Sequence, residues 1–158
     1  MKENLVAVVS ASDCILVMNV PELNLARTWT KRGMKFLIDR DLLEQAFYKL
    51  SVETMFRTGE LVTDDKQFLM DVGLLDENEQ PLVDPLTEQK MLRLIKNMPL
   101  FEFKAELEKL TRYQIQDLAD FAIIHYNDLA LDRIDVLSKA SGKDMLRAIT
   151  NYKAAEEA

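Results

Sequence analysis

The chain has 158 residues, of which 48% are hydrophobic, and its 27 acidic and 20 basic side chains give a net charge of −7. This length and composition suffice for one globular domain or two small ones, while the negative charge opposes general attraction to nucleic acid or to an anionic membrane. The longest apolar stretches, around 5–9 and 15–20, fall far short of the roughly 20 residues that cross a bilayer, and no secretion signal opens the sequence. We therefore expect a cytoplasmic protein without membrane association.

Cysteine and histidine each occur once, as Cys14 and His125. An intramolecular disulfide is excluded, and a zinc site of sulfur and imidazole ligands cannot be assembled. The four glycines show neither the Gly-x-Gly-x-x-Gly pattern of dinucleotide-binding loops nor the spacing of a P-loop. We therefore expect no metal, no cofactor and no enzymatic activity.

Residues 5–20 are the strand-like part of the chain. LVAVVSA and CILVMNV are rich in β-branched residues, and the short polar stretch 11–13 separates them, which predicts a β-hairpin. Both strands are nearly continuous in apolar residues, so we expect both faces to be covered. Two alternatives follow: the chain's own helices cover the hairpin and protect one edge, or another chain adds a strand to that edge.

The next stretch, 25–40, holds the only tryptophan and five of the twenty basic residues within sixteen positions, LARTWTKRGMKFLIDR. We predict a helix over 22–32 that ends at Gly33, because glycine adopts the left-handed conformation that closes a helix. Cations in the last turn then oppose the negative end of the helix dipole. With this ending, 34–38 forms a short extended segment that joins the hairpin as a third strand.

A helix that continues through residue 33 has a different consequence. The spacing of four residues then places Arg27, Lys31 and Lys35 on one ridge, with Arg32 beside it. Such a ridge can bind phosphate or an acidic protein, whereas a helix that ends at the glycine makes the sheet edge the favoured contact surface. The candidate partner-binding residues are Arg27, Trp29, Lys31, Arg32 and Lys35.

Short helices and one strand are expected up to residue 75. Asp41–Glu44 has capping-box spacing and begins a helix, and Ser51 begins a second one. A short strand is predicted at 61–63. A third helix then starts at Asp64 or Asp65.

The segment LDENEQPLVD, ending at Asp84, marks a boundary because it is acidic and contains a proline. We interpret 76–84 as a linker and Asp84 with Pro85 as a helix start, since aspartate accepts from free amides and proline fits the first helical position. The remainder is predicted to be wholly helical. The expected helices are 85–97, 100–109, 112–126, 129–140 and 142–155. The third of these is the most apolar and should lie at the centre of a bundle.

Two of these helix starts share capping-box spacing, Thr111–Gln114 and Ser141–Asp144. His125 lies near the end of its helix and is interpreted as structural, because no second histidine or cysteine exists to share a metal. Carboxylate pairs with a spacing of three residues also occur on these helices. They are Asp117 with Asp120 and Asp132 with Asp135. Such pairs are common on solvated helix faces, and no nucleophile or phosphate loop accompanies them.

Two stretches, VPELNLARTWTKRG and SGKDMLRAI, resemble segments of small, uncharacterised bacteriophage-encoded proteins. The resemblance implies a virion or accessory component, found in the host cytoplasm or in the virion. It implies no site residues.

The prediction is an α+β protein, predominantly α-helical, with an N-terminal β-hairpin and short helices over 1–75, an acidic linker over 76–84, and a C-terminal helical bundle over 85–158. Its predicted function is non-enzymatic: a protein–protein interaction or structural subunit of a larger assembly, homo-oligomers included, that binds through the hairpin edge and the basic stretch.

Charge is unevenly distributed along the chain. Residues 1–40 carry a net charge of +2, which leaves −9 for 41–158. Copies of such a polarised protein can stack head to tail, with the basic end of one against an acidic face of the next. The alternative function is a DNA-binding regulator that uses the basic stretch 27–40.

Overall fold

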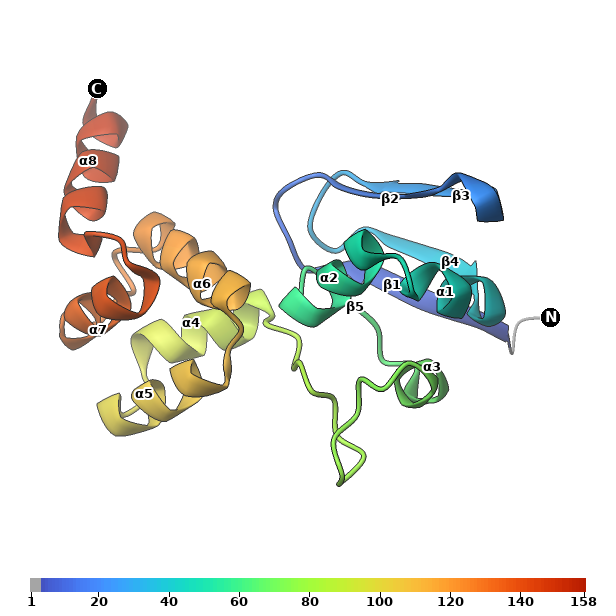
Figure 1. Cartoon of the computed structure of the whole chain (residues 1–158). Helices are drawn as coiled ribbons and strands as arrows, with labels where there is room; N and C mark the ends of the chain where they lie inside the picture. The colour runs from blue at the N-terminus through green and yellow to red at the C-terminus, as the bar shows by residue number, and fades with distance from the viewer. Residues whose placement is uncertain (1–3) are drawn as a thin grey trace. The chain divides into compact units, whose positions relative to one another are not determined.

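The computed structural model describes residues 4–158 (Figure 1). Helices account for 53% of the chain and strands for 16%, with a small N-terminal sheet followed by helices. The predicted α+β, predominantly helical class is therefore confirmed. The chain divides into two compact units, the first ending at Pro85 and the second spanning Leu86–Ala158.

The first unit contains a three-stranded antiparallel sheet in the order β4-β1-β5. Its strands are β1 (Leu5–Ser10), β4 (Lys35–Asp39) and β5 (Leu61–Val62). Val6 lies opposite Ile38, and both are fully buried. Because side chains alternate along a strand, this sheet has one face in the core and one outer face, on which Leu37 is exposed.

A separate two-stranded ribbon consists of β2 (Leu16–Val20) and β3 (Leu25–Trp29), joined by a 3-10 turn at Pro21–Leu23 (Figure 1). Burial alternates along both strands, so one face of the ribbon packs in the core of the unit and the other is exposed. Asn24 closes the turn in the left-handed conformation at φ 53°, which asparagine tolerates better than most residues.

The predicted pairing within 5–20 is wrong, because β1 pairs with β4 and β5 while β2 pairs with β3. The connection between β1 and β2 is held in a wide loop by two buried serines. Ser10 Oγ donates to the Ser12 carbonyl and accepts from the Ser12 amide, and Ser12 Oγ accepts from the Cys14 amide. These bonds satisfy the polar groups of the loop without the tight turn that a hairpin needs.

The predicted helix over 22–32 is also wrong, since the centre of this segment is β3. Leu25 and Trp29 are buried whereas Ala26 and Thr28 are exposed, a period of two that suits a strand with one face in the core. Gly33, with φ 86°, is part of a turn, and its amide donates to the Ser10 carbonyl at 2.8 Å. The segment after this glycine does form a strand, as predicted, and it pairs with β1.

Three helices complete the first unit: α1 (Arg40–Phe47), α2 (Leu50–Thr58) and α3 (Lys66–Asp71). Asp39, and not Asp41, caps α1 by accepting from the amide of Leu42 at 3.0 Å. No side-chain hydrogen bond caps α2, so the predicted cap at Ser51 is wrong. Asp65 caps α3, which confirms the second of the two predicted positions.

Phenylalanines hold the three helices of the first unit together. Phe47 of α1, Phe56 of α2 and Phe68 of α3 have ring centroids 5.5 to 6.1 Å apart. These are the separations of favourable aromatic pairs. Helix α1 also contacts β1 and β4, and α2 contacts β5, so the helices cover the core side of the sheet.

The acidic segment after α3 folds back on itself. An isolated bridge joins Leu75 to Pro81, and Asp76 Oδ1 accepts from the amides of Asn78 and Gln80. Helix α4 (Glu88–Lys96) begins later than predicted, because Thr87 Oγ1 is the cap that accepts from an amide of the first turn. The predicted helix start at Asp84 is therefore wrong.

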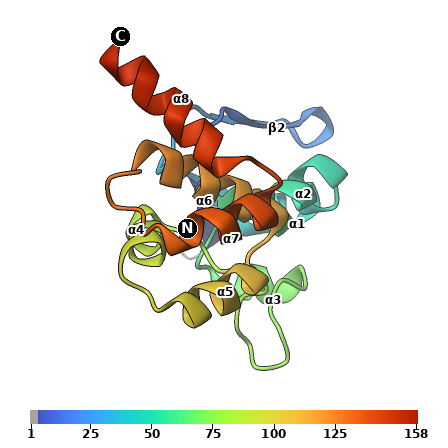
Figure 2. The ribbon, with the colours of Figure 1, turned by 90° about the vertical axis from the view of Figure 1, so that its left-hand side faces the viewer.

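The second unit is a bundle of five helices, α4 to α8. The last four are α5 (Leu100–Lys109), α6 (Arg112–Ile124), α7 (Asp132–Ser141) and α8 (Met145–Glu157). Figure 2 shows α6 in the middle of the bundle, and it contacts α4, α7 and α8, as predicted. The capping box Thr111–Gln114 is confirmed. The second predicted box is wrong, because Asp144 itself caps α8.

A buried arginine connects three helices of the bundle. Arg133 of α7 is 3% exposed, and its Nε donates to the carbonyl of Leu94 at 2.9 Å, in the last turn of α4. Its guanidinium carbon lies 5.2 Å from the centroid of the Phe103 ring in α5, and Nη1 pairs with Asp132 at 2.6 Å. The side chain therefore satisfies a carbonyl that the helix end leaves without an intrahelical partner.

Candidate functional site

The predicted partner-binding residues lie on β3, on the turn that follows it and at the start of β4. Arg27 and Trp29 belong to β3, Lys31 and Arg32 to the turn, and Lys35 is the first residue of β4. No helix passes through residue 33, so the predicted basic ridge with a four-residue spacing does not exist. Arg27 and Trp29, two residues apart, share one face of β3, and both contact Phe36, whereas Lys35 lies on the exposed face of β4.

Trp29 is a core residue and not a contact for a partner. Its side chain is 0% exposed, and Nε1 donates to the carbonyl of Val8 at 3.1 Å. The ring packs edge-on against Phe36, with centroids 5.2 Å apart. Trp29 thus fastens the ribbon to the sheet, because it contacts β1 and β4 from β3.

The two arginines of the set are engaged within the first unit. The guanidinium carbon of Arg27 lies 5.9 Å from the ring centroid of Phe36, and Nη1 donates to the carbonyl of Ala26. Arg32 pairs with Asp13 at 3.0 Å. This ion pair connects the turn after β3 to the loop between β1 and β2, the loop that carries the exposed thiol of Cys14.

Lys31 and Lys35 differ from the arginines, because both are exposed and neither has an ion-pair partner among residues 4–158. Of the four predicted cations, these two are therefore available to bind a partner. Two separated lysines make a smaller positive surface than the ridge that the sequence suggested.

Unpaired strand edges are the second component of the site. Within the described part of the chain, β2 pairs only with β3, and β4 pairs only with β1, so each has one side without a neighbouring strand. Apolar side chains lie exposed beside these edges. They are Ile15 at 65%, Val17 at 56% and Leu37 at 55%. Bare strand edges of this kind are templates for pairing with another chain.

An ion pair that the sequence did not suggest connects α1 to α3 in the first unit. Arg40 Nη2 donates to Asp65 Oδ2 at 2.8 Å, and both side chains are partly buried. The hydrogen bond from Arg40, together with the amide of Phe68, lowers the pKa of the Asp65 carboxyl below its usual value. The pair joins the start of α1 to the cap of α3, which is a structural role.

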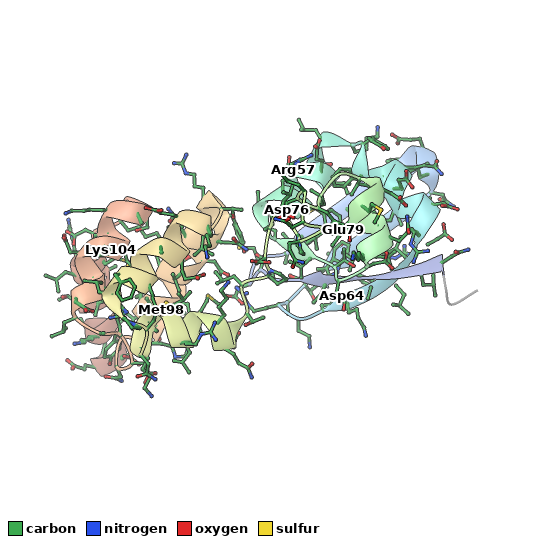
Figure 3. The ribbon with its side chains drawn as sticks, turned by 90° about the horizontal axis from the view of Figure 1, so that it is seen from below. Arg57, Asp64, Asp76, Glu79, Met98 and Lys104 are labelled. Carbon is green, nitrogen blue, oxygen red and sulfur yellow. The ribbon has the colours of Figure 1, made fainter. Side chains whose placement is uncertain are left out.

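A cavity of about 120 Å³ lies between α2, β5, α3 and the segment after α3. Its wall is mainly apolar, with Phe56, Leu61 and Leu74 among its residues, and Thr63 and Asp64 supply the polar side chains. Figure 3 shows this unit from below, with Asp64 between β5 and α3 and with Asp76 and Glu79 in the loop that follows. The lining includes no histidine, cysteine or lysine, and the Thr63 hydroxyl oxygen accepts from the amide of Asp65 at 3.2 Å.

Asp120, Asp132 and Asp135, which the sequence singled out in the second unit, are engaged in ion pairs, the second of them with Arg133. Asp120 pairs with Lys143, and Asp135 pairs with Lys139 at 3.2 Å. His125 stacks on Phe121 with ring centroids 4.1 Å apart. Within residues 4–158, no group of three or more histidine, cysteine or acidic side chains is placed to hold a metal ion.

None of the helices in the described chain combines the length and the apolar composition that spanning a bilayer requires. Comparison with known proteins gives no assignment, because no family model, curated protein or solved structure matches this chain.

Proposed function

We propose that this protein is a non-enzymatic interaction or structural subunit, which binds other protein chains through the free strand edges of its first unit. The observation that carries the proposal is the coincidence of unpaired strand sides with exposed apolar residues at Ile15, Val17 and Leu37. We further propose that the assembly belongs to a phage virion or to phage accessory components in the host cytoplasm, which the resemblance of two segments to phage proteins supports.

Strand edges favour this proposal for a physical reason. The backbone groups on a free edge are ready to form a ladder with an added strand, and alternate side chains supply the specificity of such binding. Natural sheets usually protect long edges by bulges, prolines or covering loops. The strands β2 and β4 contain no proline, and no hydrogen bond from another segment of residues 4–158 reaches the open side of either strand.

Lys31 and Lys35 add a preference for an acidic partner, since both are exposed and lack ion pairs in residues 4–158. Opposite charges at the rim of an interface mainly raise the rate of association and orient the partner. The DNA-binding alternative gains no observation of its own, because Arg27 and Arg32 are engaged with Phe36 and Asp13.

The proposal is tested by native mass, measured by light scattering, together with a pull-down from the native source. We expect either a mass above that of one chain or a retained protein. Val17→Lys and Leu37→Lys place a charge on the two exposed strand faces, and at least one of them should weaken the association. Leu131→Lys is the matched control, since Leu131 is 83% exposed in the second unit. A strictly monomeric protein that retains no partner refutes the proposal.

A further inference from the structure

Strand β4 is one of the two edge strands of the three-stranded sheet, and the order of its outward-facing residues is unusual. Lys35, Leu37 and Asp39 alternate onto the outer face, and all three are exposed. Asp39 Oδ1 accepts from the Leu42 amide, and Oδ2 has no hydrogen bond within residues 4–158. The lysine likewise has no ion pair there. The strand therefore presents one free cation, one apolar side chain and one available carboxylate oxygen.

This order is self-complementary. When two antiparallel copies of KFLID are centred on Leu37, each Lys35 lies opposite Asp39 of the other copy, and Leu37 meets its own equivalent on the axis. Residues that lie directly opposite each other share a face of the sheet, so both ion pairs form on the outer side. A two-residue slip in either direction loses both charge pairs.

The other free strands lack this property. Centring two copies of β3 on its middle residue sets Arg27 against Arg27, which is a repulsive pair. The strand β2 carries no charge to select a register, and β5 has only two residues. An edge lysine by itself discourages strand pairing, but here the second copy places an aspartate opposite it.

We propose that the partner on β4 is a second copy of this chain, which extends the sheet to six strands in the order β5-β1-β4-β4-β1-β5 about a two-fold axis at Leu37. The contact is isologous: the same strand serves both copies, and the contact closes on itself. This inference rests on the proposed function and names the partner for one of its edges.

Charge reversal tests the register directly. Lys35→Asp leaves the edge with acidic groups at both ends, and Asp39→Lys leaves it with basic groups at both ends. Each variant alone should raise the dissociation constant of the dimer about tenfold or more, because two attractive pairs become repulsive. An equimolar mixture of the two variants regains both pairs, so we expect it to form a heterodimer. Sedimentation equilibrium at low salt measures all three samples, since salt screens exposed pairs.

Separate controls show whether the variants are folded and whether the effect depends on the position of the changed residue. Asp39→Lys removes the cap of α1, so far-UV circular dichroism must show a folded chain. Leu37→Lys tests the axis without touching the cap and should also weaken the dimer. Lys66→Asp makes the same charge change at an exposed position of α3, away from β4, and should leave the dimer unchanged.

The outcomes separate the inference from the function on which it rests. A wild-type dimer that resists both Lys35→Asp and Leu37→Lys overturns the β4 contact and leaves the proposed function standing. A wild-type monomer that still retains another protein does the same. A monomer without any retained partner overturns both, and variants that associate only when mixed support both.

Discussion

Replacing Arg133 is expected to destabilise the second unit more than any change to its exposed cations. In Arg133→Met, the Leu94 carbonyl loses a hydrogen bond from a charged donor, worth about 1.5–3 kcal/mol, and stacking on Phe103 is lost. The half-exposed ion pair with Asp132 contributes less than about 1 kcal/mol. Relief of a buried charge offsets part of this loss, so we expect about 2 kcal/mol for the methionine variant. Arg133→Ala also leaves a cavity and should lose about 4 kcal/mol.

Urea unfolding followed by far-UV circular dichroism measures these losses, because helices dominate that signal. The fluorescence of Trp29, the only tryptophan, reports the first unit in the same samples. Arg147→Ala is the control: this arginine is exposed on α8, and its loss should change the free energy of unfolding by less than about 0.5 kcal/mol. If Arg133→Met unfolds at the wild-type urea concentration, the guanidinium does not stabilise the bundle, and the reasoning from its contacts is wrong.

Three further predictions concern single groups. Trp29→Phe leaves the Val8 carbonyl without the indole donor, so the free energy of unfolding should fall by about 1–3 kcal/mol, measured in urea by circular dichroism. The pKa of Asp65 is lowered in the folded state by Arg40, so its stabilisation is complete above the unfolded value of about 3.9 and declines as the pH falls toward the folded value. Melting temperatures from pH 6 to pH 3 should therefore fall more steeply for wild type than for Asp65→Asn. Asp144→Ala removes the cap of α8, and chemical denaturation should show a loss of about 1 kcal/mol.

The helices after residue 85 were predictable because their signals are local. The capping box at Thr111 and the apolar run of α6 depend only on residues within a few positions of each other. The capping residues were predicted less well than the helices themselves, because two side chains near the helix start could each accept from the free amides. Asp39 displaces Asp41 at α1, and Thr87 displaces Asp84 at α4, because the backbone amides point at the residue that immediately precedes the helix.

The first forty residues were harder to predict because their partners are distant in sequence. Nothing near β1 indicates that its neighbours are Lys35–Asp39 and Leu61–Val62. The segment around Trp29 contains good helix formers, and its burial in the core overrides that preference. One signal was present: Leu25 and Trp29 are separated by four residues, a spacing that suits a strand face as well as a helix face.

The candidate site shows the same division. The sequence indicated that the stretch 25–40 was special, but it could not separate a core tryptophan from exposed lysines. Arg32 is oriented by Asp13, nineteen residues earlier, and such long-range pairing leaves no periodic trace. The sequence predicted the sheet edge as the contact surface on one condition, namely that no helix runs through residue 33. The structure meets that condition, and the contact surface itself stays a prediction.

The central position of β1 in its sheet has a consequence for the order of folding. This strand precedes β4 and β5 in the chain, so both must be synthesised before its two sides are paired. Long-range pairing of this kind slows folding, whereas the local contacts of the helical unit favour rapid folding. A nascent chain therefore displays LVAVVS, an uncharged β-forming segment, without a partner strand. On the ribosome, the vulnerable interval of this protein is the time between the appearance of Leu5–Ser10 and that of Lys35–Asp39.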